Sequence, residues 1–196
     1  MSIRPATAAD SAAIARICLL TGSSGTDATG KFCDDAAVSD VYATPYLHGP
    51  GGFALVWELD GEPVGYILGT TDTHAFQEWF SSDWWPRKGA GRSIKTADDG
   101  WLIPSAADPA RMLNAFVDDY PAHLHIDLLP EAQGQGAGRA LIEAMMGELR
   151  ERGVPGVHLE TDIANEGANA FYPRVGFSEL LRTEGGFIWG RKVDQQ

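Results

Sequence analysis

The chain has 196 residues and a net charge of −12, because 27 acidic residues outnumber 15 basic ones. A negative field of this size opposes non-specific binding to nucleic acid and to anionic membranes. The apolar fraction of 44% is ordinary for a globular protein, and no stretch approaches the roughly 20 apolar residues of a membrane span.

The N-terminal apolar stretch has no features of an export signal. It is interrupted by Arg16 and lacks the basic segment and apolar core of a signal peptide. Cys18 and Cys33 supply neither a disulfide framework nor a metal-ligand spacing. We therefore expect a cytoplasmic protein with a single domain over residues 1–196.

The first seventy residues predict a strand, a helix, a loop region and a hairpin. The helix has capping-box spacing at Thr7 and Asp10 and can end at Gly22, with Ile14, Ile17 and Cys18 in its apolar stripe. Ile3–Pro5 is a short predicted strand, and residues 23–50 predict a loop that contains a short helix. Strands are predicted at 53–59 and 63–70 on either side of Asp60-Gly61. That pair tolerates the positive φ angles of a tight hairpin turn.

Residues 72–120 predict an insertion packed on the core. Helices are expected at about 74–81 and 108–117. The segment is rich in tryptophan, at Trp79, Trp84, Trp85 and Trp101. These side chains could form the core of the insertion, line a binding pocket or make a dimer interface.

From residue 122 onward, strand and helix patterns alternate. Strands are predicted at 123–129, 157–163 and 187–191, and helices at 139–152 and 165–175. This order predicts an α/β fold, in which helices flank a mixed sheet that has parallel strands in its middle.

A glycine-rich loop joins the first of these strands to the first helix. It consists of Gln133-Gly134-Gln135-Gly136-Ala137-Gly138-Arg139. The glycines allow a ligand close to the backbone, and the first helical turn offers unpaired N–H groups, so the loop predicts a pyrophosphate site. A P-loop would need Gly-Lys-Ser/Thr, and the dinucleotide fingerprint would need glycine in place of Arg139. The alternative is a tight turn without a ligand.

The loop and a second segment resemble a known family. Gln133-x-x-Gly136-x-Gly138 resembles motif A of the GNAT acetyltransferases, Q/R-x-x-G-x-G/A. Asn165-x-x-Ala168-x-x-Phe171-Tyr172-x-x-x-Gly176-Phe177 resembles the next family motif. The likeness extends to the opening Ile3-Arg4-Pro5-Ala6-Thr7 with Asp10 and to the 53–70 hairpin. It covers most of the chain outside 72–120 and implies the GNAT acyl-CoA N-acyltransferase fold.

A narrower likeness lies before the glycine loop. Tyr120-Pro121-Ala122-His123-Leu124-His125-Ile126-Asp127-Leu128-Leu129-Pro130 looks like bacterial relatives of the acetyltransferase-like C-terminal domain of O-GlcNAcase. Cys18–Gly22 and Tyr42–Leu47 support this likeness. Some members of that group are suspected of having lost catalysis, but the glycine loop is intact here, so cofactor binding is expected.

The resemblance implies acetyl-CoA as the co-substrate and a role for several residues. Backbone groups of Leu128 and Leu129 would pair with the pantetheine arm, as an added strand would. The amides of Gln133–Arg139 would hold the pyrophosphate. Asn165 would contact the pantetheine, and Phe171 would pack beside it.

Acyl transfer to an amine also needs an acid and a base. Tyr172 matches the family's acid, which protonates the departing thiolate; the alternative is a tyrosine that only packs in the core. His123, His125 and Asp127 share one face of the 123–128 strand. His125 and Asp127 are the first candidates for the base, directly or through a water, and Glu160 is the next; a structural hydrogen-bond network is the alternative.

The same three residues of this strand face also permit a metal hypothesis. Same-face neighbours on a strand lie almost 7 Å apart, so one ion would require their side chains to converge. We therefore expect no metal.

We expect an N-acetyltransferase in which an amine attacks acetyl-CoA directly in a ternary complex, while a strand N–H polarises the acetyl carbonyl. The acceptor, a small molecule or a protein lysine, is not identified by the sequence; an acidic surface suits a cationic one. The alternative is a non-enzymatic GNAT-like module that binds CoA or a protein partner. The aromatic insertion also suggests a homodimer.

Overall fold

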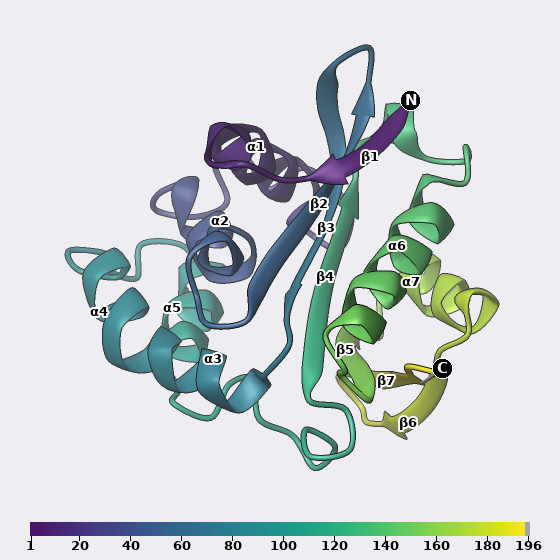
Figure 1. Ribbon diagram of the computed structural model, residues 1–196. Coiled ribbons are helices and arrows are strands. Elements are labelled where there is room, and N and C mark those ends of the chain that lie inside the picture. Colours follow the sequence, from purple (N-terminus) through teal and green to yellow (C-terminus); the bar gives the residue numbers. More distant parts are fainter. Residues whose placement is uncertain (195–196) are drawn as a thin grey trace.

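The computed structural model describes residues 1–194, which form one seven-stranded sheet with helices on both faces (Figure 1). The strand order is β1-β2-β3-β4-β5-β7-β6. The strands are β1 (Ser2–Pro5), β2 (Gly52–Leu59), β3 (Glu62–Thr70), β4 (Ala122–Leu128), β5 (Gly156–Asp162), β6 (Ser178–Arg182) and β7 (Gly186–Lys192).

The α-helices fall into two groups along the chain. They are α1 (Ser11–Thr21), α2 (Ala36–Tyr42), α3 (Thr73–Trp79), α4 (Trp85–Lys88), α5 (Asp99–Ala107), α6 (Ala137–Glu151) and α7 (Glu166–Phe171). Short 3-10 turns lie at Ala8–Asp10, Thr44–Leu47, Pro130–Ala132 and Tyr172–Val175, and a π-helical turn lies at Phe80–Trp84. Helices α1 to α5 cover one face of the sheet and α6 and α7 cover the other (Figure 1).

The predicted mixed sheet is confirmed. β4 and β5 are parallel, whereas the other neighbouring strands are antiparallel. The β2–β3 turn has the expected geometry, with φ of 53° at Asp60 and 85° at Gly61. The edge strand β6 was not predicted, because its burial is low and its sequence lacks a clear apolar alternation.

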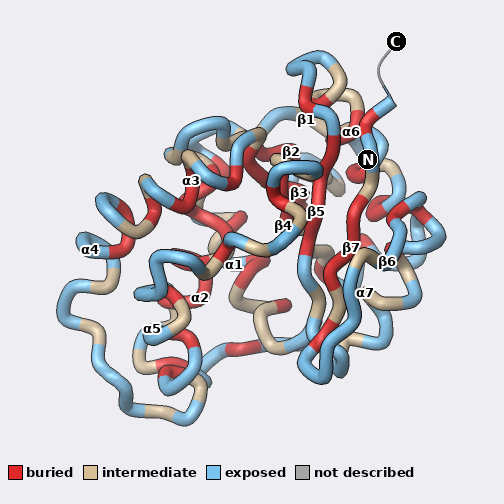
Figure 2. Tube along the Cα trace, turned by 90° about the horizontal axis from the view of Figure 1, so that it is seen from below, coloured by how far each residue is buried: buried red, intermediate tan, exposed pale blue. Residues whose placement is uncertain are grey.

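Each face of the sheet has its own apolar core, and buried positions run along the middle of the sheet (Figure 2). Helix α6 contributes Leu141, Ile142, Met145, Met146 and Leu149 to one core at helical spacing. Burial of side chains of this size stabilises by roughly 1.5–3 kcal/mol each, which fixes α6 and the loop before it against the sheet.

The predicted helix over 165–175 is divided in two. Helix α7 ends at Phe171, and a 3-10 turn continues to Val175. Pro173 lacks a backbone N–H, so it cannot extend α7 by an ordinary helical bond. Gly176, at φ 85°, ends the turn.

The insertion at 72–120 folds differently from the prediction in part. The helix expected at 74–81 is confirmed as α3, but the helix expected at 108–117 is wrong. Side chains compete there for the backbone: Ala110 N–H donates to Asp108 and Phe116 N–H donates to Asn114. Such local turns replace helical hydrogen bonds. The unpredicted helix α5 precedes them.

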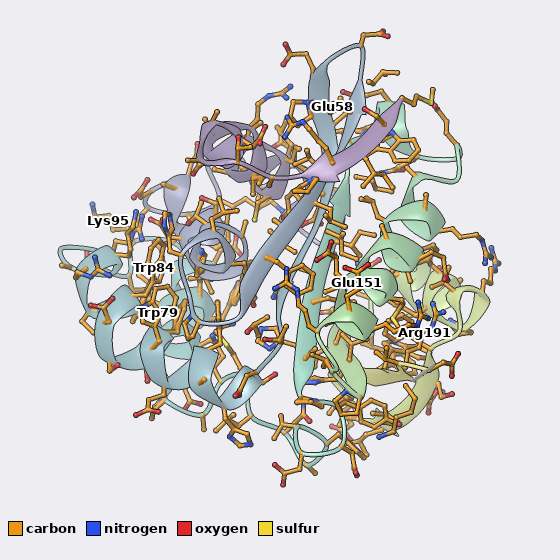
Figure 3. All side chains as sticks on the ribbon, in the orientation of Figure 1. Glu58, Trp79, Trp84, Lys95, Glu151 and Arg191 are labelled. Carbon is orange, nitrogen blue, oxygen red and sulfur yellow. The ribbon has the colours of Figure 1, made fainter. Side chains whose placement is uncertain are left out.

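The tryptophans of the insertion mainly pack against one another and the core. Trp84 and Trp85 are buried, and the rings of Trp79 and Trp84 lie 5.4 Å apart (Figure 3). Trp101 remains 45% exposed. Packing is therefore the role of Trp84 and Trp85. Within residues 1–194, no helix is long and apolar enough to cross a membrane.

Candidate functional site

The parallel strands β4 and β5 separate after two rungs of pairing. Their register contains only Ala122↔Val157 and His123↔His158, although β4 continues to Leu128 and β5 to Asp162. The outer edge of each strand remains paired, β4 with β3 and β5 with β7. The sheet therefore opens between two strands that are each held firmly on the other side.

The hydrogen-bonding register between β3 and β4 determines which backbone groups of β4 face this opening. Leu129 N–H donates to Val64 C=O at 2.9 Å. Since antiparallel partners alternate, Ile126 and Leu128 direct their backbone groups away from β3 and toward the opening. Leu128 therefore fits the contact expected with the pantetheine arm. Leu129 does not, because its N–H already donates to Val64 C=O. Ile126 faces the opening as well, and sequence reasoning did not single it out.

The glycine loop lies at the carboxyl end of β4. Gly134 and Gly136 have φ of 72° and 80°, which L side chains rarely adopt, and Gly136 precedes the first turn of α6. The carboxamide of Gln133 donates to Leu128 C=O at 2.9 Å, and that of Gln135 donates to Glu131 C=O at 2.7 Å. The unpaired N-terminal amides of α6, starting at Ala137, thus lie at one end of the opening, which is the arrangement that an anion site requires.

Gly138 has a different function from the two glycines before it. A Cβ at this position would lie 3.1 Å from Phe171 Cζ, so the missing side chain lets α6 approach α7. The guanidinium of Arg139 donates to Arg174 C=O at 2.8 Å and ties the same two segments together. Gly138 and Arg139 therefore hold the start of α6 against α7 and the turn that follows it.

Asn165 is the N-cap of α7. Its side-chain oxygen accepts a hydrogen bond from Ala168 N–H at 3.1 Å, a contact that satisfies a helix-end donor. Phe171 is partly buried and packs against Gly138 and the ring of Tyr172. Asn165 therefore caps α7, and Phe171 packs between α6 and the turn after α7. The cap uses only the side-chain oxygen of Asn165 and not its amide nitrogen.

Tyr172 begins the 3-10 turn after α7 and is 5% exposed. Its ring lies 5.4 Å from Phe177 and 6.3 Å from Trp189. Burial, with a smaller contribution from the Asp127 charge, raises the pKa of the Tyr172 hydroxyl. The group therefore remains protonated and can donate a proton.

The side chains on the polar face of β4 form a chain of hydrogen bonds in which each donor and acceptor can be assigned. Thr73 Oγ1 donates to Pro121 C=O at 2.7 Å and lies 2.9 Å from His123 Nδ1, so His123 Nδ1 is the donor. His123 Nε2 then accepts from Tyr46 O–H at 2.7 Å. Tyr46 Oη in turn accepts from His125 Nε2 at 2.9 Å. This pattern assigns the proton of His125 to Nε2 and leaves its Nδ1 with a lone pair.

Both histidines are neutral at physiological pH. Burial, with the neighbouring Arg111 charge as the second cause, lowers the pKa of His125 to about 3. Burial holds the pKa of His123 well below its usual value. A neutral imidazole with a free lone pair can accept a proton, although the same lowering of its pKa reduces its strength as a base.

Asp127 occupies a separate environment on the same strand face. It accepts a hydrogen bond from the Tyr66 hydroxyl, and burial raises the pKa of its carboxyl group. Burial, and after it the Asp127 charge, raises the pKa of the Cys18 thiol, so Asp127 lies on the side of the sheet that α1 covers. The strand face therefore does not gather His123, His125 and Asp127, and among residues 1–194 no cluster of His, Cys, Asp or Glu is arranged to hold a metal ion.

A cavity of about 460 Å³ lies on the polar side of the opening. Its walls come from segments distant in sequence, which contribute Tyr42, Tyr46, Arg111, His125, Glu160 and Phe187. Of the sequence candidates for the base, His125 and Glu160 line this cavity and Asp127 does not. Glu160 accepts a hydrogen bond from Asn114 Nδ2 at 3.0 Å. Tyr46 and Arg111 were not predicted, because no motif marks them.

The comparisons with known proteins agree with this architecture. The Acetyltransferase (GNAT) family model matches residues 26–177, more than half of the chain. The crystal structure of SsHAT superposes with a TM-score of 0.90 at 36% identity, covering 99% of this chain and 98% of that one. The chain belongs to the GNAT acetyltransferase family.

Two further similarities are more limited. The Escherichia coli K12 [ribosomal protein bS18]-alanine N-acetyltransferase is 39% identical over 72 residues, 37% of this chain and 41% of that relative. The match therefore spans less than half of that protein. The structure of yncA from Salmonella typhimurium, solved with its cofactor acetyl-CoA, has a TM-score of 0.55 at 19% identity, covering 100% of this chain and 95% of that one. At this identity the likeness shows the fold.

Proposed function

We propose that this protein transfers the acetyl group of acetyl-CoA to an amine by direct attack in a ternary complex. The observation that carries the proposal is the opening between β4 and β5, which has a phosphate-type loop at one end and His125 in the adjacent cavity. GNAT acetyltransferases use acetyl-CoA as the acetyl donor.

The described residues fit this co-substrate. The first-turn amides of α6 suit the pyrophosphate. The backbone groups of Ile126 and the N–H of Leu128, whose C=O already accepts from Gln133, suit a pantetheine arm that pairs like a strand. The acetyl thioester, when bound, supplies the activated acyl group. Ile126 N–H would polarise its carbonyl, and the free amide nitrogen of Asn165 would contact the pantetheine.

His125 would serve as the base. Its Nδ1 would take the proton of the attacking amine as the N–C bond forms, while Nε2–H stays bonded to Tyr46. The hydrogen bonds through Tyr46 and His123 hold the imidazole in the required tautomer. Asp127 is a weaker candidate because it lies outside the cavity and is bonded to Tyr66.

Tyr172 would serve as the acid. As the C–S bond breaks, its hydroxyl would protonate the departing thiolate of CoA. This hydroxyl is protonated at physiological pH, so the proton is available, and the assignment itself rests on the match of Tyr172 to the family motif.

The test is release of free thiol from acetyl-CoA over a panel of small amines and lysine peptides. His125→Gln should lower kcat by about 100-fold or more while leaving the Kd for CoA unchanged. His74→Gln, a change at an exposed histidine, is the matched control. Normal turnover by His125→Gln would remove the base assignment, and absence of turnover with tight CoA binding would favour the binding-module alternative.

Two finer expectations also remain proposals. The narrower likeness to bacterial relatives of the O-GlcNAcase C-terminal domain can be tested by comparing the acceptor panel of this protein with that of such a relative. A homodimer can be tested by light scattering. The E. coli relative is named an alanine N-acetyltransferase and yncA is described as a putative acetyltransferase, so neither name supports the non-enzymatic alternative.

A further inference from the structure

Arg111 is the only arginine or lysine among the described residues that line the cavity beside His125. It belongs to the turn that follows α5, in the insertion. In a chain with a net charge of −12, a cation in this position is a specific feature of the cavity.

The guanidinium of Arg111 has no anionic partner. Its Nε and Nη2 atoms are buried and make no hydrogen bond with any described residue. Its contacts are with rings: the Cζ atom lies 5.4 Å from the Tyr42 centroid and 4.8 Å from the Phe80 centroid. Leaving buried donors of a half-buried cation without a partner is unfavourable, and an anion in the cavity would satisfy them.

The turn that carries Arg111 is held in place. Met112 N–H donates to Gln77 Oε1 at 3.0 Å, and Gln77 is 2% exposed on α3. A fixed backbone next to Arg111 limits the positions that its side chain can reach. The unpaired guanidinium of Arg111 is therefore carried by a segment of the cavity wall whose backbone is held in place.

The carboxylates of the cavity are engaged elsewhere. Glu160 accepts from Asn114 Nδ2, and Asp162 accepts from Ala164 N–H at 2.7 Å. Within residues 1–194, neither forms an ion pair with Arg111. An anionic group on a ligand in the cavity would supply the partner that Arg111 lacks.

The position of Arg111 also limits the size of that ligand. The rings of Tyr42 and His125 lie 5.6 Å apart, so Arg111 and His125 both lie within that distance of one ring centre. They are at most twice that distance apart. An acceptor that spans this gap directly, with a hydrogen bond of about 3 Å at each end, therefore has no more than roughly 5 Å between its amine and its anionic group.

We propose that Arg111 binds a carboxylate of the acceptor, and that the acceptor is a small amino acid with its amine and carboxylate no more than about four bonds apart. This inference rests on the proposed acetyl transfer. A planar guanidinium suits a carboxylate because it can donate two parallel hydrogen bonds. A lysine side chain of a protein carries no such group at this spacing.

The first test compares amino carboxylates with their neutral amides in the thiol-release assay: glycine, β-alanine and 4-aminobutyrate with glycinamide, β-alaninamide and 4-aminobutanamide. Wild type should prefer at least one carboxylate by about 10- to 100-fold in kcat/KM. The amino groups of the neutral amides are less basic than those of the carboxylates, so a larger fraction of them is deprotonated at the assay pH. A preference for the carboxylates therefore cannot arise from the fraction of deprotonated amine. Arg111→Met should remove it through KM, and Arg87→Met, at an exposed arginine, should preserve it.

A second measurement does not require turnover. With the protein saturated by CoA, so that the loop at α6 is occupied, propionate should raise the Tm of wild type more than propionamide at equal ionic strength. Arg111→Met should lose this difference while remaining as stable as wild type, because removing an unpaired buried cation relieves a cost.

The outcomes separate the two proposals. Equal effects of propionate and propionamide, or equal rates with carboxylates and amides, would overturn the carboxylate site and leave acetyl transfer intact. A marked loss of stability in Arg111→Met, with equal ligand effects, would make Arg111 a structural clamp for Tyr42 and Phe80. Failure to bind CoA would overturn the proposed function, and the Tm difference in the CoA-free protein would then decide the carboxylate site.

Discussion

The two sides of the β4–β5 opening are built in different ways. The side proposed to hold CoA consists mainly of backbone groups from residues 126–139, a continuous segment. The cavity side consists of side chains from at least five separate segments, among them Tyr42, Arg111, His125, Glu160 and Phe187. A backbone site is encoded by glycine spacing, whereas a side-chain site depends on which segments the fold brings together.

The largest effect is expected from a negative charge on the backbone side. Gly136→Asp should weaken CoA binding by more than about 100-fold, because a carboxylate would stand beside the pyrophosphate amides. Gly136→Asn is the matched control, since Asn has the same shape and both residues tolerate positive φ. Calorimetric titration with CoA measures both. Equal Kd values for the two variants would contradict the anion site.

A smaller effect is expected at Tyr172, the proposed acid. Tyr172→Phe should lower kcat by about 10- to 100-fold without changing the Kd for CoA, since the ring and its packing are retained. Tyr120→Phe, at a tyrosine that packs against Gly156, is the control. Unchanged kcat in Tyr172→Phe would limit this residue to a packing role.

The cavity side should respond to pH through stability. Because the folded-state pKa of His123 lies well below 6.5, the unfolded chain takes up the proton first as pH falls. The stabilisation present above pH 6.5 is thus lost below it, by about 2 kcal/mol between pH 7 and pH 5 for one fully neutral histidine. His123→Asn should remove about this much of the difference in unfolding free energy between the two pH values.

Denaturant unfolding at pH 7 and pH 5 measures this slope. His74→Asn, at an exposed position, should leave it unchanged. An unaltered slope in His123→Asn would show that His123 is not the neutral buried group described above.

The smallest effect separates two roles of Asn165. Asn165→Ala should destabilise the fold by about 1 kcal/mol through loss of the N-cap. Asn165→Asp retains a capping oxygen but loses the amide nitrogen proposed to contact the pantetheine. A several-fold higher Kd for CoA in Asn165→Asp, at near wild-type stability, would support that contact; an unchanged Kd would leave only the cap.

The same contrast explains what the sequence could predict. The hairpin at Asp60-Gly61, the loop at Gly134–Gly138 and the strand–helix order after residue 122 follow from local patterns, and the structure confirms them. The helix expected at 108–117 failed because Asp108 and Asn114 compete locally for backbone donors. That competition is decided by tertiary contacts and not by periodicity.

The candidate site residues also differ in whether a local sequence pattern or only the fold identifies them. His125 was a candidate because its strand carries polar residues on one face, but nothing local separates it from Asp127. Tyr46 distinguishes them, since its hydroxyl bridges His123 and His125, and it comes from a turn nearly eighty residues earlier in the chain. Arg111 carries no motif, so its place in the cavity required the fold.

The hydrogen bond between Gln77 and Met112 has a consequence for how acceptor choice could be altered. The anchor uses the main chain of Met112, so the side chain next to it can be exchanged while the turn keeps its position. A library randomised at position 111 would then sample new acceptors on an unchanged acetyl-transfer apparatus. Arg111→Glu, for example, would be expected to recruit diamines. The insertion would thus act as an exchangeable selectivity element, open to laboratory evolution without redesign of the sheet.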